Sequence, residues 1–129
     1  MRVLGVELNA AELRYVVLEI DEAGYQVLAA NRLTLADTRS GTALAAFQSA
    51  ITTALNEAAP DLIAIKSKPE SGQMRAGAAA LKMEGILLAN AKCNVEFISG
   101  AKINKVAETA NELHGYLQPA FKAALAAAK

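Results

Sequence analysis

The sequence contains no tryptophan, one cysteine and one histidine, and these absences exclude several kinds of site. Because Cys93 has no partner, the chain cannot form an intramolecular disulfide or a cysteine-based zinc site. His114 cannot supply a histidine cluster, and no Ser/His/Asp arrangement is recognisable, so nucleophilic catalysis has no support. The position of His114 beside Gly115 predicts the C-terminal end of a helix.

The sequence also lacks net charge and any long apolar run. Its 13 basic and 13 acidic side chains cancel, so no strong global field attracts the protein to nucleic acid or anionic lipid. No segment approaches the roughly 18 uncharged apolar residues of a membrane span, and the N-terminus has no signal-peptide features. We therefore expect a cytoplasmic, bacterial-type protein without a membrane partner.

What is present is an aliphatic, unevenly charged chain. Hydrophobic residues make up 53% of the 129 residues and charged residues 20%, which excludes a disordered chain and predicts one domain, residues 1–129. Residues 1–65 carry four basic and eight acidic groups, whereas residues 66–129 carry nine basic and five acidic groups. This asymmetry is either ordinary surface scatter or the sign of a local anion-binding face.

The hydrophobic pattern predicts an α/β fold. Four apolar residues recur at helical spacing between Leu44 and Leu55 and predict a helix that ends near Ala58. The order βββαβαβα favours a mixed five-stranded sheet with helices on both faces. The other predicted elements are strands at 2–8, 13–20, 25–35, 61–66 and 94–98, and helices at 73–91, 99–113 and 119–129.

This order of elements resembles the ribonuclease H-like fold, and two segments resemble its RuvC-like branch, the Holliday-junction resolvases. The opening VLGVELNAAELRYVVLEI is similar to that group's first hairpin, where Glu7 falls at the position of a strand-one acid. The segment PDLIAIKSKPESGQMRAGAAALKMEGIL is similar to the group's fourth strand, loop and second helix. These likenesses imply a RuvC-like domain.

A closer resemblance is to a bacterial domain of unknown function that has a similar length and this fold. The matching pieces are GVE (Gly5 to Glu7), LTLAD, AFQ, IK (Ile65-Lys66) and KME. Membership of that family implies the fold and implies no activity.

The RuvC-like resemblance implies a metal-dependent nuclease, but most of the necessary acids are missing. Two-metal hydrolysis needs several carboxylates that converge on two ions. The fourth strand of the resolvase pattern ends in an acid, where this sequence has Lys66, and the segment that matches its last helix contains no acid. One carboxylate, Glu7, cannot hold two divalent ions. We expect no metal and no cofactor, unless Glu7 acts with Glu70 or Glu84 on Mg²⁺ or Mn²⁺.

Lys66 offers a replacement for the metal. In this fold the first and fourth strands are adjacent and parallel, and Glu7 and Lys66 each fall near a carboxyl end. Alternation along both strands is compatible with one shared face. If the faces agree, the Lys66 ammonium pairs with the Glu7 carboxylate and neutralises it without a free ion.

Glu84 has two interpretations. At 100° per residue it lies near the helix face of Gly77, Leu81 and Leu88. A carboxylate at the edge of an apolar face is either part of a structural ion pair, which is the favoured interpretation, or a metal ligand.

The loop after the fourth predicted strand is the best candidate for an anion-binding site. Free N–H groups at a helix start, a glycine and several cations can hold a phosphate. The spacing from Gly72 to Gly77 is that of a P-loop, but Ala78-Ala79 replaces the Lys-Ser/Thr pair, so no nucleotide P-loop is predicted. A solvated loop is the alternative. The predicted anion- or nucleic-acid-binding residues are Lys66, Lys68, Ser71, Gly72, Arg75, Lys102 and Lys105.

Three functions remain open at this point. The first is a non-catalytic module that binds nucleic acid or a protein partner. The second is a divergent metal-dependent nuclease that uses Glu7 with Glu70 or Glu84. The third is a structural homodimer in which alanine-rich helices form the interface. Neutral net charge argues mildly against tight duplex binding, because phosphate neutralisation dominates such affinity.

Overall fold

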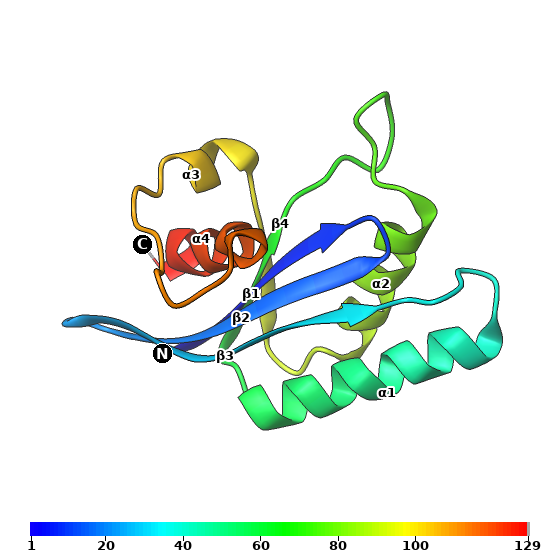
Figure 1. Cartoon of the computed structure of the whole chain (residues 1–129), viewed down its shortest axis with the longest axis horizontal. Helices are drawn as coiled ribbons and strands as arrows, with labels where there is room; N and C mark the ends of the chain where they lie inside the picture. Colours follow the sequence, from blue (N-terminus) through cyan, green and yellow to red (C-terminus); the bar gives the residue numbers. More distant parts are fainter. Residues whose placement is uncertain (129) are drawn as a thin grey trace.

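A five-stranded mixed sheet with the strand order β3-β2-β1-β4-β5 forms the centre of the molecule (Figure 1). The computed structural model describes residues 1–128 of the chain. The predicted mixed five-stranded sheet is confirmed, and each predicted strand lies within two residues of its observed bounds. The strands are β1 (Arg2–Asn9), β2 (Glu12–Asp21), β3 (Gly24–Thr34), β4 (Leu62–Lys66) and β5 (Asn94–Ile98).

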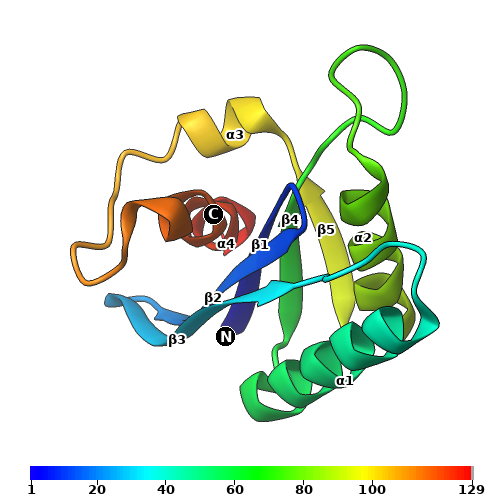
Figure 2. The same cartoon turned by 45° about the vertical axis from the view of Figure 1, so that its right-hand side comes forward.

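Strand β1 lies at the centre of the sheet and joins its antiparallel and parallel halves. It pairs antiparallel with β2 and parallel with β4, while β4 pairs parallel with β5. The carboxyl ends of β1, β4 and β5 therefore lie along one edge of the sheet, which we name the carboxyl edge (Figure 2). Ligand sites of α/β sheets usually lie at such an edge.

Helices cover both faces of the sheet, as predicted (Figures 1 and 2). One face is covered by α1 (Gly41–Ala58) and α2 (Ala78–Asn90), and the other by α4 (Gln118–Ala128) with α3 (Gly100–Asn104) and the short 3₁₀-helix η1 (Gly115–Leu117) beside it. None of the helices described within residues 1–128 has the length and apolar character that a membrane crossing requires.

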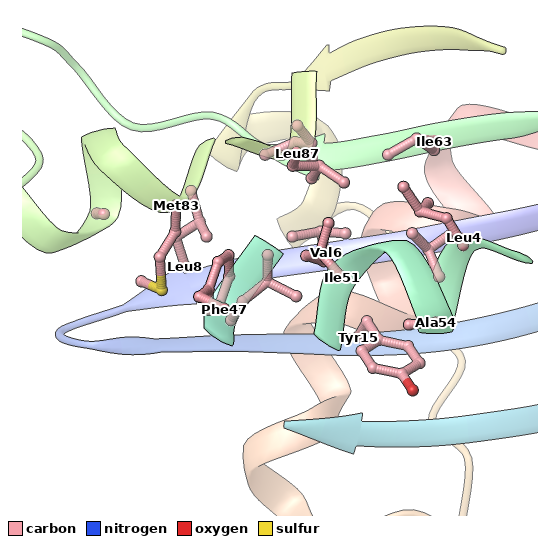
Figure 3. Packing of buried hydrophobic residues seen from close by; sticks show 14 of the residues in the cluster. Leu4, Val6, Leu8, Tyr15, Phe47, Ile51, Ala54, Ile63, Met83 and Leu87 are labelled. Carbon is pink, nitrogen blue, oxygen red and sulfur yellow. The ribbon is translucent and has the colours of Figure 1, made fainter. Parts of the chain in front are cut away.

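Alternation along β1 divides its side chains between two hydrophobic cores. Leu4, Val6 and Leu8 point to the face covered by α1 and α2 (Figure 3). There they meet Phe47 and Ile51, which belong to the helix face predicted from the apolar spacing. Val3 and Gly5, on the opposite side of the same strand, face the second core under α4.

Gly5 allows α4 to lie directly against the sheet. A Cβ atom at Gly5 would clash with the carbonyl oxygen of Ala120 and would lie 2.9 Å from the Cβ of Ala124. Ala120, Ala123 and Ala124 are fully buried at this contact. The glycine of β1 and the alanines of α4 are therefore matched parts of one close backbone approach.

The start of the second predicted helix is wrong. The sequence predicts a start at Gln73, but α2 begins at Ala78, after an extended Gly77 that provides no side-chain cap. Gly72 has φ +90, and the N–H of Ala76 donates to the Pro69 carbonyl oxygen at 2.6 Å. These features close the segment from Pro69 to Ala76 into a loop. The N–H groups of this segment are therefore not the free N–H groups of a helix start.

The helix predicted from Ser99 to Leu113 is also wrong, because α3 ends at Asn104. The following segment is irregular, and Gln118 stabilises it by bonding both the N–H and the carbonyl of Ala110, at 3.1 and 2.8 Å. His114 consequently precedes η1 instead of ending a helix. The last helix begins at Gln118, close to the predicted start, and its predicted end at Lys129 lies outside the described residues.

The close packing at Gly5 generates a stability prediction. We expect Gly5→Ala to lower the free energy of unfolding by about 3 kcal/mol, the upper part of the usual cost of overpacking, because the added methyl group meets the backbone of α4. Gly85→Ala is the matched control. Gly85 is exposed in α2, and a methyl group added there has open space around it, so the alanine should raise stability by about 0.5–1 kcal/mol. Urea unfolding of both variants measures the difference, and equal effects would contradict the close approach.

Candidate functional site

Glu7 lies at the carboxyl edge, on the face of β1 that is covered by α4. It follows Val3 and Gly5 in the alternation of the strand. The residue is 6% exposed, and among residues 1–128 it is the only charged side chain that is buried. Burying a carboxylate costs free energy unless opposite charges compensate it. The neighbours of Glu7 therefore decide what this position can do.

Two cations, one from each neighbouring strand, flank the Glu7 carboxylate. The Lys66 Nζ at the end of β4 lies 3.5 Å from Glu7 Oε2, and Nη1 of Arg14 in β2 lies 3.5 Å from Glu7 Oε1. The expected pairing of Lys66 with Glu7 is thus confirmed. Glu7 Oε1 is buried and accepts no hydrogen bond within the described residues. The negative charge of Glu7 is therefore compensated mainly by the nearby positive charges of Lys66 and Arg14.

The ion pairs continue across the sheet. The Arg14 Nε donates to Glu12 Oε1 at 3.0 Å, and the Arg32 Nη1 in β3 lies 3.6 Å from Glu12 Oε2. Glu7 stands opposite Arg14 in the β1–β2 register, and Arg14 stands opposite Arg32 in the β2–β3 register. We name this set the charged row: Lys66, Glu7, Arg14, Glu12 and Arg32. Its three cations and two acids leave one excess positive charge.

An aromatic pair covers the β3 end of the charged row. The Tyr116 ring of η1 lies beneath the guanidinium carbons of Arg14 and Arg32, 5.4 and 5.3 Å from its centroid. The His114 ring stacks on Tyr116 with centroids 5.6 Å apart and an interplanar angle of 8°. Cation–π attraction of this kind contributes about 0.5–2 kcal/mol and favours these positions of the guanidinium groups. The row is therefore ordered by strands on one side and by η1 on the other.

The residues of the charged row do not fit a pair of divalent metal ions. Such a pair needs several carboxylates that converge on it. Within residues 1–128, no group of three histidine, cysteine or acidic side chains could hold a metal ion. Lys66 places an ammonium group beside Glu7, Glu12 binds two arginines, and the first turn of α4 contains no acid. These residues therefore favour ion pairs within the protein over the binding of divalent metal ions.

The structure does not bring Glu84 to Glu7. Helix α2 packs on the face of Leu4, Val6 and Leu8, whereas Glu7 lies on the opposite face. The predicted helix face is also wrong, because α2 buries Ala80, Met83 and Leu87 while Leu88 is 42% exposed.

Glu84 has an unfavourable environment for its charge. Within the described residues it forms no ion pair, so the favoured interpretation of a structural salt bridge is not supported. Partial burial raises the pKa of Glu84 above its ordinary value, and the nearby charge of Glu70 raises it further. Glu70 itself is exposed in the loop after β4. These two acids therefore lie near each other, and neither forms an ion pair with a member of the charged row.

The structure separates Lys66 from the other predicted anion-binding residues, which lie on the segments that follow β4 and β5. Lys66 is engaged by Glu7, so it belongs to the charged row. Ser71 and Gly72 lie in the loop ahead of α2, so the helix N-terminus that was expected to support them is not there. Both the loop after β4 and helix α3 after β5 stand at the carboxyl edge (Figures 1 and 2). The cations on these two segments are Lys68, Arg75, Lys102 and Lys105.

Two hollows of the described surface are lined by residues outside the charged row. One groove of about 530 Å³ runs between α1 and α2, and another of about 320 Å³ lies beside Cys93 and Pro60. Within the row itself, Glu7 is buried, whereas the Arg32 side chain is 55% exposed, so the row is accessible chiefly at its β3 end.

Four residues that meet at the site were not predicted from the sequence: Glu12, Arg14, Arg32 and Tyr116. A signal was available for Arg14. The β1–β2 turn consists of Ala10 and Ala11 between the paired Asn9 and Glu12, and this register places Arg14 opposite Glu7. The position of Arg32 opposite Arg14 could not be predicted in this way, because the β2–β3 register shifts between Val17 and Leu18.

Solved structures place the fold in the RuvC-like, ribonuclease H-like class. RuvC from Thermus thermophilus matches with a TM-score of 0.80 and 14% identity over 99% of this chain and 93% of that chain. A second T. thermophilus RuvC structure, in complex with a Holliday junction substrate, matches with a TM-score of 0.77 and 15% identity over 99% and 92% of the two chains. The fowlpox virus resolvase in complex with Holliday junction DNA matches with a TM-score of 0.59 and 12% identity over 98% and 96%. At these identities the likeness shows the fold alone.

The chain belongs to the DUF3010 family, described as proteins of unknown function, whose model matches residues 1–127. This confirms the resemblance to a RuvC-like domain of unknown function. No curated protein matches the chain at a significant level.

The pairing of Lys66 with Glu7 predicts a loss of stability in Lys66→Met. We expect a decrease of about 1–3 kcal/mol in the free energy of unfolding. This is less than the roughly 3–5 kcal/mol for breaking a well-buried pair, because Arg14 remains beside Glu7 and the Lys66 side chain is 32% exposed. Lys92→Met, which removes an exposed cation, should change stability by less than about 0.5 kcal/mol.

The pairing is isolated by repeating Lys66→Met in a Glu7→Gln background. With no carboxylate to compensate, the loss of Lys66 should cost clearly less there, as measured by urea unfolding. An equal cost in both backgrounds would show that Lys66 acts without Glu7.

The raised pKa of Glu84 predicts a pH-dependent gain in stability for Glu84→Gln. The folded state holds the Glu84 proton more tightly than the unfolded state, so wild-type stability falls as the pH rises through and above the ordinary glutamate range. The glutamine variant avoids this loss. We expect it to be more stable than the wild type at pH 7 and to lose this advantage below about pH 4, where both states are protonated. A variant less stable than the wild type at pH 7 would disprove the unfavourable environment.

Proposed function

We propose that this chain is a non-catalytic nucleic-acid-binding module on a RuvC-like fold. The observation that carries the proposal is the Lys66 ammonium, 3.5 Å from the Glu7 carboxylate, at the strand end where the resolvase pattern has an acid. A fixed ammonium neutralises the carboxylate but offers no coordination position for a water molecule. Metal-activated water is what phosphodiester hydrolysis by two ions requires. The site therefore supports binding better than cleavage.

The distribution of cations supports nucleic acid as the ligand. Arg75, Lys102 and Lys105 are exposed on segments that leave the carboxyl edge, and Lys68 is partly exposed there. Arg32, at the far end of the charged row, has a side chain that is 55% exposed. Cations gathered at one edge can neutralise successive phosphates even when the whole chain is neutral. Two of the structural neighbours are complexes with Holliday junctions, which is consistent with a DNA ligand.

The homodimer alternative is weakened by the position of the alanine-rich helix α4. Ala120, Ala123 and Ala124 are fully buried against the sheet of their own chain. They are therefore not available as an interface. This leaves the cations of the carboxyl edge as the better argument for a partner.

Binding and cleavage assays with branched, duplex and single-stranded DNA test the proposed function. We expect binding that weakens as salt increases, and no cleavage with Mg²⁺ or Mn²⁺. Lys68→Ala combined with Arg75→Ala should reduce the slope of log affinity against log salt by about 1–2, because up to two phosphate contacts are lost. Fluorescence anisotropy at several salt concentrations measures the slope.

Lys92→Ala is the control for nonspecific charge loss, because Lys92 lies at the opposite end of β5 from the carboxyl edge. It should leave the slope unchanged. Absence of binding at low salt, or an unchanged slope in the double variant, would contradict the proposal. Specific cleavage that Glu7→Gln abolishes would restore the nuclease alternative.

A further inference from the structure

Tyr116 contacts the two arginines of the charged row, whereas His114 contacts Tyr116 and is not a member of that row, and the two rings differ in exposure. Tyr116 is partly buried against the second core, while His114 is exposed. Leu117, which follows Tyr116, is buried and anchors η1. Its N–H donates to the His114 carbonyl oxygen at 3.0 Å. The backbone that carries the aromatic pair is therefore held in place.

The order of the two rings gives His114 a fixed orientation. It lies parallel to Tyr116, at an interplanar angle of 8°, and Tyr116 is in turn held by the guanidinium groups of Arg14 and Arg32. An exposed ring normally loses side-chain entropy when a ligand stacks on it. Here the stack on Tyr116 already restricts the imidazole, so a flat ligand can add to the stack at reduced cost.

We infer that His114 is a stacking platform for an unpaired nucleobase. Bases within a duplex have their faces covered by neighbours, whereas a base in a single strand offers a free face to an aromatic ring. Arg32, whose side chain is 55% exposed, contacts the same Tyr116 ring as His114, so it can offer a charge to a phosphate of a strand that reaches the platform. The ligand is thus a single-stranded nucleic acid. This inference rests on the proposed nucleic-acid binding and specifies the form of strand.

The experiment compares intact and abasic single strands. A labelled DNA strand of about 12 nucleotides suits one small domain. We expect His114→Ala to weaken its binding by about 5- to 100-fold, the range for loss of one base–aromatic stack. His114→Phe should keep affinity within about threefold of the wild type because it retains a ring. His114→Lys should bind as weakly as His114→Ala, since a cation without a ring does not replace a stack.

An abasic strand of the same length separates stacking from phosphate contacts. The wild type should bind it about as weakly as His114→Ala binds the intact strand, and His114→Ala should show no further loss. A strand that contains 2-aminopurine gives a direct signal, because its fluorescence should be quenched by the wild type and by His114→Phe but not by His114→Ala. An RNA strand of the same sequence is a second arm that shows which sugar the platform prefers.

The outcomes distinguish this inference from the proposed function. Equal binding of intact and abasic strands, or unchanged binding by His114→Ala, would overturn the platform while nucleic-acid binding stands. Absence of wild-type binding to branched, duplex and single strands alike would overturn both. Because His114 is exposed, its variants should have the same unfolding midpoint as the wild type, and this comparison excludes misfolding as the cause of weak binding.

Discussion

Glu7 is a buried carboxylate that depends on cations from both neighbouring strands, and this dependence constrains the whole sheet. An uncompensated charge at this depth would cost several kcal/mol. Lys66 and Arg14 can reach it only if β4 and β2 hold their registers with β1, which set Val6 beside Ile65 and Glu7 beside Arg14. A slip of one residue would turn the charges of a strand toward the core of Leu4 and Val6. The ion pairs therefore specify strand register as well as contributing to stability.

The same constraint explains why α4 is built from small residues. Its backbone lies against Gly5, two positions before Glu7, and this close approach removes water from the strand face that leads to the carboxylate. A side chain at Gly5 would clash with the backbone of α4 and force the helix and the strand apart. With no acid in the first turn of α4, the cations on the two neighbouring strands meet no competing carboxylate from the helix. Close packing and charge compensation are thus two requirements of one site.

Much of this arrangement could be predicted from the sequence, and the failures have physical causes. The strands follow from their β-branched runs, and the Lys66–Glu7 pair follows from two alternating strands that end at one edge. Arg32 could not be placed, because Leu28 is an extra residue in β3. Without that bulge Arg14 would lie opposite Asn31, and Arg32 would point to the other face. Tyr116 lies in a segment whose irregular path depends on side-chain bonds from Gln118, which no local periodicity reveals.

The replacement of a metal by an ammonium changes what the carboxyl edge can do with a phosphate. A bound divalent ion attracts phosphate and also activates water, so binding and hydrolysis are coupled. Lys66 supplies charge without an open coordination position, and its charge does not depend on ion concentration. Within the charged row a phosphate must compete with Glu12 for the arginines. It would do so most easily at Arg32, whose side chain is 55% exposed and whose ion pair, at 3.6 Å, is longer than the 3.0 Å contact of Arg14. The protein can therefore attract a phosphate without activating water for hydrolysis. The accessible charge is Arg32 at the β3 end of the row, against Tyr116, while the Lys66–Glu7 ion pair occupies the end of β1 and β4.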